Sequence, residues 1–284
     1  MLCTPIRTYR AGMARRLSHI PSGGARFPRH PDIMQDQAAI KGGAERVLYV
    51  LATLARLERG ATIAELTRHT GLAQSTLYRQ LSLLKRWGFV IDRQNEYSPG
   101  PMCVPLAWGF DQSSFLIQAS HEKLNELSRA SGESIGLLAA VRHQVVCLDM
   151  VESSHSLRCS FVKGRSLPLG KGASAKALLA FMGPAHQAHE LDHLGDSAQF
   201  DEAARSLLEQ QLADIRKQGH ATSNSEVDAG IWGISAPVFQ QHGKTAAAVI
   251  TLMAPWSRAQ GREQQLTDLI VRAASQISSR LQNP

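Results

Sequence analysis

Residues 71–90, GLAQSTLYRQLSLLKRWGFV, constrain the fold of this chain more than any other stretch. Leu77, Leu81 and Leu84 recur at i, i+4 and i+7, which predicts a helix with one apolar stripe that packs on a core. The other faces carry hydroxyl, amide and basic side chains, namely Gln74, Ser75, Thr76, Arg79, Gln80, Lys85 and Arg86. A helix that enters the DNA major groove needs such groups to reach phosphates and base edges. An amphipathic surface helix with a basic outer face is the alternative interpretation.

The segments before this helix favour DNA binding. From residue 44, apolar residues at helical spacing predict a core-facing helix; they are Val47, Val50, Leu51 and Leu54. Thr62 and Glu65 have the spacing of a capping box, which predicts a second, short helix that ends at Gly71. The turn Gly71–Ala73 then leads into the third helix, as in a helix-turn-helix.

The segment after the third helix predicts a β-wing. Past Gly88, the sequence FVIDRQNEYSPG predicts two short strands joined near Gln94 and Asn95, with Arg93 at the tip. Together these segments predict a winged helix-turn-helix domain over residues 41–100.

Charge is distributed unevenly along the 284 residues, whose length suits two domains. Residues 1–110 hold 15 Lys and Arg against 7 Asp and Glu, whereas residues 111–284 hold 16 against 17. A polyanionic partner is therefore expected at the N-terminal part, and the helix pattern favours nucleic acid over an anionic membrane.

The cysteines and the apolar stretches indicate the compartment. Cys3, Cys103, Cys147 and Cys159 are widely spaced, which argues against a disulfide framework or a zinc knuckle. The longest uncharged apolar stretch, 246–256, is too short to span a bilayer, so it predicts a buried strand and no membrane partner. We expect a cytoplasmic protein.

Residues 1–40 predict a disordered basic extension. They contain six arginines, several Pro and Gly, and no acidic residue before Asp32. This segment could be a transit peptide, a nucleic-acid-binding arm or an inert tail, and Met34 could be the true start.

The remaining chain predicts an α+β domain. Residues 101–115 suggest a linker helix, and a longer helix that ends at Gly132 begins the C-terminal domain, 116–284. Two hairpins, with turns at 142–144 and 240–243, are separated by helices at 173–182, 184–194 and 201–218, and a helix at 260–282 ends the chain. This order predicts an antiparallel sheet with flanking helices.

Three sequence blocks, in order, resemble the IclR family of bacterial transcriptional regulators. The first runs from ERVLYVLATLA through TIAELTRHTGLAQSTLYRQLSLLKRWGFV, the second is GRSLPLGKGASAKALLA at 164–180, and the third is GHATSNSEVDAGIWGISAPVF at 219–239. The resemblance covers nearly everything after residue 40. It implies a GAF-like C-terminal fold, no cofactor, and assembly as a homodimer or homotetramer on a double-stranded DNA operator.

The resemblance also implies site residues. The DNA-binding candidates are Gln74, Ser75, Thr76, Arg79, Arg86 and Arg93. The candidates for binding a small-molecule effector are Leu167, Ala173, Ser174, Ser223, Ile231, Gly233, Thr251 and Met253. Gly170–Gly172 and Ala175 depart from the family pattern, which concerns the ligand pocket rather than the fold. Gly233 and Met253 favour an acid with a bulky apolar or aromatic body over a two- or three-carbon acid.

A metal-dependent hydrolase is the main alternative function. His189 to His193 form a literal HExxH with His186 one turn upstream, a pattern that can bind zinc. The helix is short and has polar flanks, so a solvated helix face is the preferred interpretation.

Two further motifs fail the requirements of catalysis. Gly164 stands one residue too far from Gly170 for a phosphate loop, and no Ser or Thr follows Lys171. Neither Cys159 with His155 nor Ser174 with Lys176 has the spacing of a known covalent catalyst. We therefore predict no enzyme, but a DNA-binding transcriptional regulator, either repressor or activator, controlled by a small organic or aromatic acid. A C-terminal domain that only oligomerises is the remaining alternative.

Overall fold

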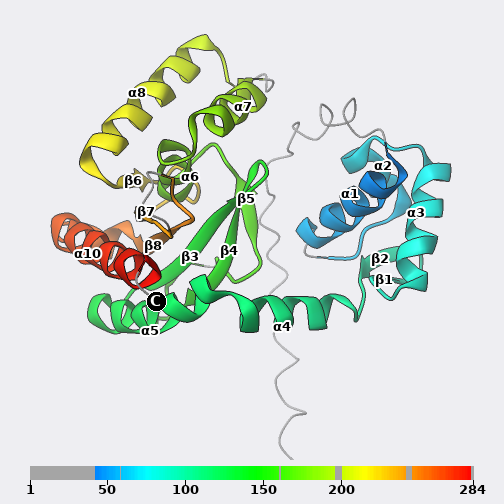
Figure 1. Cartoon of the computed structure of the whole chain (residues 1–284), viewed down its shortest axis with the longest axis horizontal. Helices are drawn as coiled ribbons and strands as arrows, with labels where there is room; N and C mark the ends of the chain where they lie inside the picture. Colours follow the sequence, from blue (N-terminus) through cyan, green and yellow to red (C-terminus); the bar gives the residue numbers. More distant parts are fainter. Residues whose placement is uncertain (1–41, 58, 160, 196–199, 241–244, 283–284) are drawn as a thin grey trace, which may run out of the picture. The chain divides into compact units, whose positions relative to one another are not determined.

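The structure is a computed structural model that describes residues 42–57, 59–159, 161–195, 200–240 and 245–282 (Figure 1). The predicted basic extension, residues 1–40, lies outside the described residues. Within the described part, no helix combines the length and apolar character needed to cross a bilayer.

The N-terminal helices follow the predicted pattern. They are α1 (Gly43–Arg56), α2 (Ile63–Thr70) and α3 (Gln74–Arg86). Thr62 and Glu65 form the predicted capping box at the start of α2, and Gly71 ends α2 in the left-handed conformation at φ 64°. The apolar side chains of all three helices meet in one core; its fully buried members include Val50, Leu54, Leu66, Leu77, Leu81 and Leu84.

The wing consists of β1 (Val90–Arg93) and β2 (Glu96–Pro99). Gln94 and Asn95 have φ values of 52° and 66°, so they make a tight two-residue turn of the type that antiparallel hairpins prefer. Ala61 and Tyr97 exchange two backbone hydrogen bonds of 2.8 Å, which tie β2 to the segment before α2. Lys85 of α3 also pairs with Asp92 of β1, so the wing is held at both sides.

Two helices connect the wing to the sheet: α4 (Cys103–Ser113) and α5 (Phe115–Ser131). Ser114 caps α5 by accepting a hydrogen bond from the Ile117 N–H, and Gly132 ends the helix at φ 79°. α4 differs from the other helices because its large apolar side chains face solvent; Val104, Leu106, Trp108 and Phe110 are all exposed.

The C-terminal sheet has six antiparallel strands in the order β5-β4-β3-β8-β7-β6. The two predicted hairpins form its centre, as β3 (Ser134–Val141) with β4 (Gln144–Val151) and β7 (Ile231–Val238) with β8 (Ala248–Pro255). The edge strands β5 (Ser166–Pro168) and β6 (Ala221–Asn224) were not predicted, because three or four residues show no measurable alternation.

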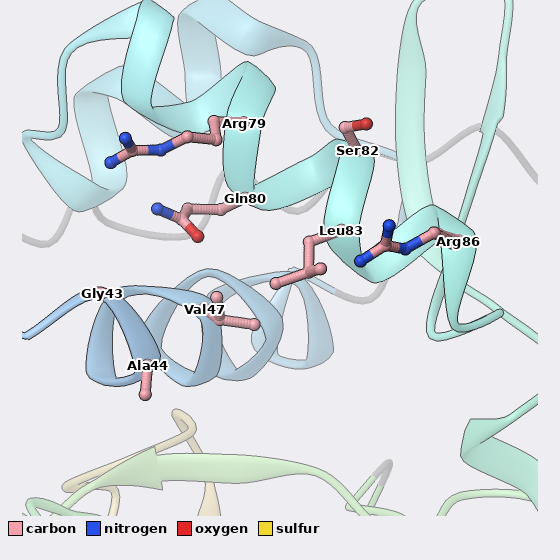
Figure 2. A pocket seen from close by; sticks show the side chains of 8 residues that line it. All are labelled: Gly43, Ala44, Val47, Arg79, Gln80, Ser82, Leu83 and Arg86. Atoms are coloured by element: carbon pink, nitrogen blue, oxygen red, sulfur yellow. The ribbon is translucent and has the colours of Figure 1, made fainter.

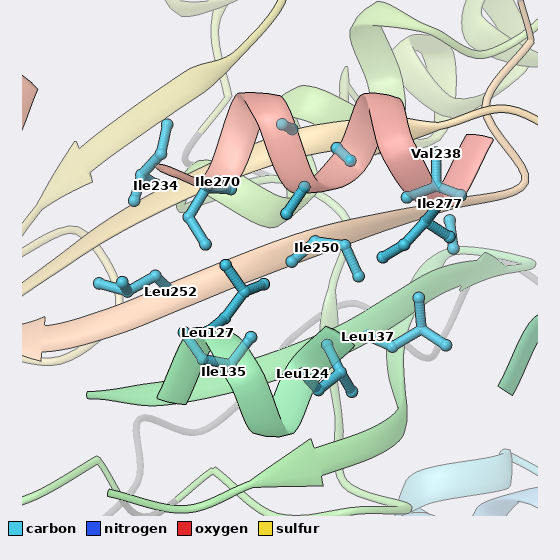
Figure 3. Close-up of a cluster of buried hydrophobic side chains, with 14 of the residues drawn as sticks. Leu124, Leu127, Ile135, Leu137, Ile234, Val238, Ile250, Leu252, Ile270 and Ile277 are labelled. Carbon is cyan, nitrogen blue, oxygen red and sulfur yellow. The ribbon is translucent and has the colours of Figure 1, made fainter. Parts of the chain in front are cut away.

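Helices cover both faces of the sheet. α5 and α10 (Glu263–Gln282) pack on one face, where Figure 3 shows their leucines and isoleucines against β3, β7 and β8. The other face is covered by α6 (Ala173–Ala180), α7 (Pro184–Gly195) and α8 (Glu202–Gln218). Along β3, Leu137 enters the first core and Leu138 the second, so the central strands are apolar on both sides.

A buried ion pair fixes the short helix α9 (Trp256–Ala259) against the end of α5. Arg258 donates to both carboxylate oxygens of Glu133, at 2.7 Å and 2.6 Å, and its third nitrogen donates to the Leu157 carbonyl. The Glu133 side chain is only 1% exposed, so Arg258 takes the place of water as the partner of its carboxylate.

Replacing Arg258 with Ala should destabilise the C-terminal domain by about 3 kcal/mol, because it leaves the Glu133 carboxylate buried without its partner. Chemical denaturation followed by circular dichroism measures this loss. Arg272→Ala is the matched control, because Arg272 is exposed and lies 4.0 Å from Asp268. The control should change stability by less than about 0.5 kcal/mol. Equal effects of the two substitutions would contradict the assignment.

Candidate DNA-binding surface and ligand cavity

The predicted DNA-binding residues lie on the outer face of α3 and on the wing. Five of the six are exposed, and Thr76 is half-buried. Ser75, Arg79, Ser82 and Arg86 follow one another at spacings of four, three and four, so they form one stripe opposite the buried leucines. The stripe offers hydroxyl and guanidinium groups without a carboxylate, which suits contact with nucleic acid.

The prediction that Gln80 lies on an outer face of α3 is wrong. The residue is only 4% exposed because it projects toward α1. The spacing of the three leucines shows which face of α3 is buried, but it does not show how far that face extends around the helix. Gln80 lies at the border of the buried face and was therefore predicted to be exposed.

All eight predicted effector residues line a single cavity in the C-terminal domain. They come from α6 and from strands β5, β6, β7 and β8. The cavity volume is about 60 Å³. Residues that were not among the predicted effector-binding candidates complete the lining: Leu138, Val145, Cys159, Phe161, Lys171, Gly172, Ala175, Val227 and Asp228. Val227 and Asp228 lie within the third block that resembles the family, and this position could have identified them as residues that line the cavity.

The start of α6 forms the polar end of this cavity. The Ala173 N–H donates to Ser223 Oγ at 3.0 Å, and the Gly172 N–H donates to Glu226 at 3.1 Å. The other Glu226 oxygen accepts from Lys176, whose side chain is 9% exposed, at 2.7 Å. The next two amides of α6, those of Ser174 and Ala175, have no hydrogen-bond acceptor in the described part of the chain.

The opposite wall consists of adjacent strands. A Cβ on Gly233 would lie 3.3 Å from Ser223 Oγ and 3.7 Å from the Ala173 side chain, so any larger residue there would fill the cavity. Thr251 shares a 2.8 Å hydrogen bond with Ser235 at the base. Cys159 contributes an apolar thiol, because burial raises its pKa to about 11 and keeps it protonated at neutral pH. This argues against Cys159 as a nucleophile.

The HExxH histidines are arranged differently from a zinc site. The Glu190 carboxylate forms a 2.8 Å hydrogen bond with Nδ1 of His143. The rings of His143 and His193 stack, with their centroids 3.7 Å apart. Within the described ranges, no group of three or more His, Cys, Asp or Glu is arranged to hold a metal.

Two family models match this chain. Residues 43–92 match the IclR helix-turn-helix domain, and residues 111–279 match the C-terminal domain of the bacterial transcriptional regulator IclR. The second match alone spans more than half of the sequence.

Whole proteins show the same similarity. The chain is 27% identical over 240 residues to the transcriptional repressor IclR of Escherichia coli, covering 82% of this chain and 87% of that protein. It is 28% identical over 252 residues to the regulator BhcR of Paracoccus denitrificans, covering 86% and 88%. An IclR family regulator from Brucella abortus has the same fold, with a TM-score of 0.74 at 19% identity over 89% of this chain and 97% of that one.

The start of α2 generates a pH-dependent prediction. A hydrogen bond from Arg59, followed by one from the Thr62 N–H, lowers the pKa of Glu65 to about 2. Because the folded pKa lies below the ordinary 4.5, the ionised carboxylate stabilises the domain above pH 4.5, and this contribution is lost as the pH falls toward 2.

Glu65→Gln keeps the capping-box geometry and removes the charge. Urea denaturation should show the variant about 1 kcal/mol less stable at pH 7, a figure reduced for the exposed Arg59 partner. The difference should shrink as the pH is lowered from 4.5 toward 2. A difference that stays constant over this range would show that the charge has no role.

Proposed function

Because the chain belongs to the IclR family of bacterial transcriptional regulators, we propose that it represses transcription from an operator that it binds as a dimer, under the control of a small carboxylate effector. The outer stripe of α3 is the observation that supports the DNA-binding role most directly. Family membership and the relatives place the protein among regulators rather than hydrolases.

In this proposal α3 enters the major groove. Ser75 and Thr76, at the start of the helix, position the protein on phosphates, and Gln74 lies beside them. Arg79 and Arg86, further along the stripe, reach a phosphate or a base edge. Arg93, exposed at the end of β1, contacts the flanking backbone from the wing.

Repression and dimerisation have separate support. Two relatives are named as repressors, the Escherichia coli protein and the acetate operon repressor of Salmonella typhimurium, which is 26% identical over 82% of this chain and 87% of that protein. The exposed apolar side chains of α4 would be covered by a second copy, because such patches are unfavourable in water. The family resemblance also implies that two dimers assemble into a tetramer through their C-terminal domains.

The operator experiment tests the DNA-binding proposal. Repeated selection of the purified protein on a library of random duplexes should enrich an inverted repeat, with half-site centres about one helical turn or a multiple of it apart. Arg79→Ala should weaken binding to the selected duplex by about 1–3 kcal/mol if Arg79 contacts a base. Failure to enrich any sequence would contradict the proposal.

The cavity supports an effector with a carboxylate. The Ser174 and Ala175 amides lie at the positive end of α6, and Lys171 and Ser223 line the same space. These groups can hold an anionic head, while Leu138, Phe161 and Met253 surround the rest of the ligand with apolar surface.

The cavity volume bears on the size of the effector. Pockets for drug-sized ligands are roughly 300–1,000 Å³, whereas this cavity measures about 60 Å³. A small carboxylate therefore needs less rearrangement than an aromatic acid. The aromatic acid favoured by the sequence would require the residues that line the cavity to move outward. Thermal-shift measurements with both kinds of acid separate these cases, since a ligand of the native state raises its melting temperature.

Filling the cavity should abolish the effector response. Gly233→Phe places a ring where a Cβ already lies within 3.7 Å of Ala173, and Ser174→Leu crowds the polar end. Both variants should bind the selected operator about as tightly as wild type without effector, and an effector that shifts the wild-type affinity at least about tenfold should no longer do so. Fluorescence anisotropy with labelled operator measures both quantities. A normal response in both variants would show that the ligand binds elsewhere.

A further inference from the structure

An open groove of about 660 Å³ lies between the start of α1 and one flank of α3. Figure 2 shows the side chains of Arg79 and Gln80 projecting from α3 above the first turn of α1, with Arg86 two turns further along α3. Gly43, Ala44 and Val47 contribute the α1 side of the groove. This groove was not predicted from the sequence, because α1 was expected only to support the core.

The first turn of α1 offers free backbone donors to the groove. Its N-cap is Gly42, which has no side chain to accept from them, and the Gly42 carbonyl accepts only the Arg46 N–H, at 3.2 Å. The amides of Gly43 and Ala44 have no acceptor among the residues that the structure describes. Unpaired N–H groups and the helix dipole give this end a partial positive charge.

Gln80 is a second, independent sign of a ligand. Its side chain is about 96% buried, it lines the groove, and it makes no hydrogen bond within the described ranges. The Gln80 amide is not among the fully buried unpaired polar atoms of the described residues, so it reaches the groove and is open to an acceptor there. An acceptor in the groove would satisfy it.

The charges of the groove fit an anion. Arg79 and Arg86 both line it, and neither forms an ion pair with any residue in the described part of the chain. Glu45, in the first turn of α1, does not line the groove. Two guanidinium groups, one side-chain amide and the two residues that carry the unpaired backbone amides therefore line a single space that no carboxylate lines.

We propose that this groove binds a phosphate of the DNA backbone, held between the N-terminus of α1 and the Arg79 side of α3. The proposal rests on the DNA-binding role of α3 and assigns α1 a direct part in it. Backbone phosphates border the major groove that a recognition helix enters, so one strand passes along this flank of α3. The chain's own N-terminal segment is a poorer occupant, because residues 1–41 hold seven Arg and Lys against two Asp.

A proline at residue 43 tests the contribution of the α1 backbone. Proline is favoured at the first position of a helix and lacks only the N–H, and Gly42 already has the extended conformation that precedes proline. Gly43→Ala, which keeps the N–H, is the reference, and a Cβ at this position meets no atom within 4 Å. The two variants therefore differ at the site in one hydrogen-bond donor.

The measurement uses the full chain and a mixed-sequence duplex of about 30 base pairs, since phosphate contacts need no operator. Gly43→Pro should bind about fivefold more weakly than Gly43→Ala, with an unchanged melting temperature. Gln80→Leu should also weaken binding, by about threefold, without loss of stability. Arg79→Ala should reduce the slope of log affinity against log salt by about one, and Arg272→Ala on α10 should leave it unchanged.

The outcomes separate this proposal from the proposed function. Wild-type protein that fails to bind any duplex overturns the DNA-binding role itself. Normal DNA binding with equal affinities for Gly43→Pro and Gly43→Ala overturns only the groove assignment. A change in sedimentation of Gly43→Pro, without a change in DNA affinity per dimer, also overturns it and identifies the groove as a contact between copies.

Discussion

The burial of Leu77, Leu81 and Leu84 fixes the rotation of α3 about its axis. These side chains are at most 3% exposed and contact the leucines and valines of α1 and α2. Turning the helix by one residue would move them into water and lose several kcal/mol of apolar burial. The arginines and serines on the opposite side are therefore presented in one orientation, and Gln80 and the groove follow from the same constraint.

Much of the fold was readable from the sequence because its signals are local. The capping box at Thr62, the glycines that end α2 and α5, and the two-residue turn of the wing each depend on a few adjacent residues. The outlying strands β5 and β6 were missed because their pairing depends on partners elsewhere in the sheet. Short strands of this kind are defined by the neighbour that they pair with.

The effector cavity could be predicted from the sequence only in part. The eight predicted residues gather around one space, yet the sequence could not show that Ser223 and Glu226 occupy the Ala173 and Gly172 amides. Those contacts join residues about fifty positions apart. The buried position of Gln80 has a similar cause, because it depends on where α1 crosses α3. The residues at these sites could be predicted from the sequence. Their hydrogen-bond partners and the volume of the cavity could be determined only from the folded structure.

The tight turn at Gln94 and Asn95 sets the length of sequence that one copy can read. Each strand of the wing has four residues, which at about 3.3 Å each gives a reach of about 13 Å. A minor groove is about 6 Å wide, so in the proposed DNA complex the wing would reach one groove beside the helix. The footprint of a single copy would then be only a few base pairs, too few to single out one site in a genome. In the proposed dimer, the distance and symmetry between two copies on the same duplex would supply the selectivity.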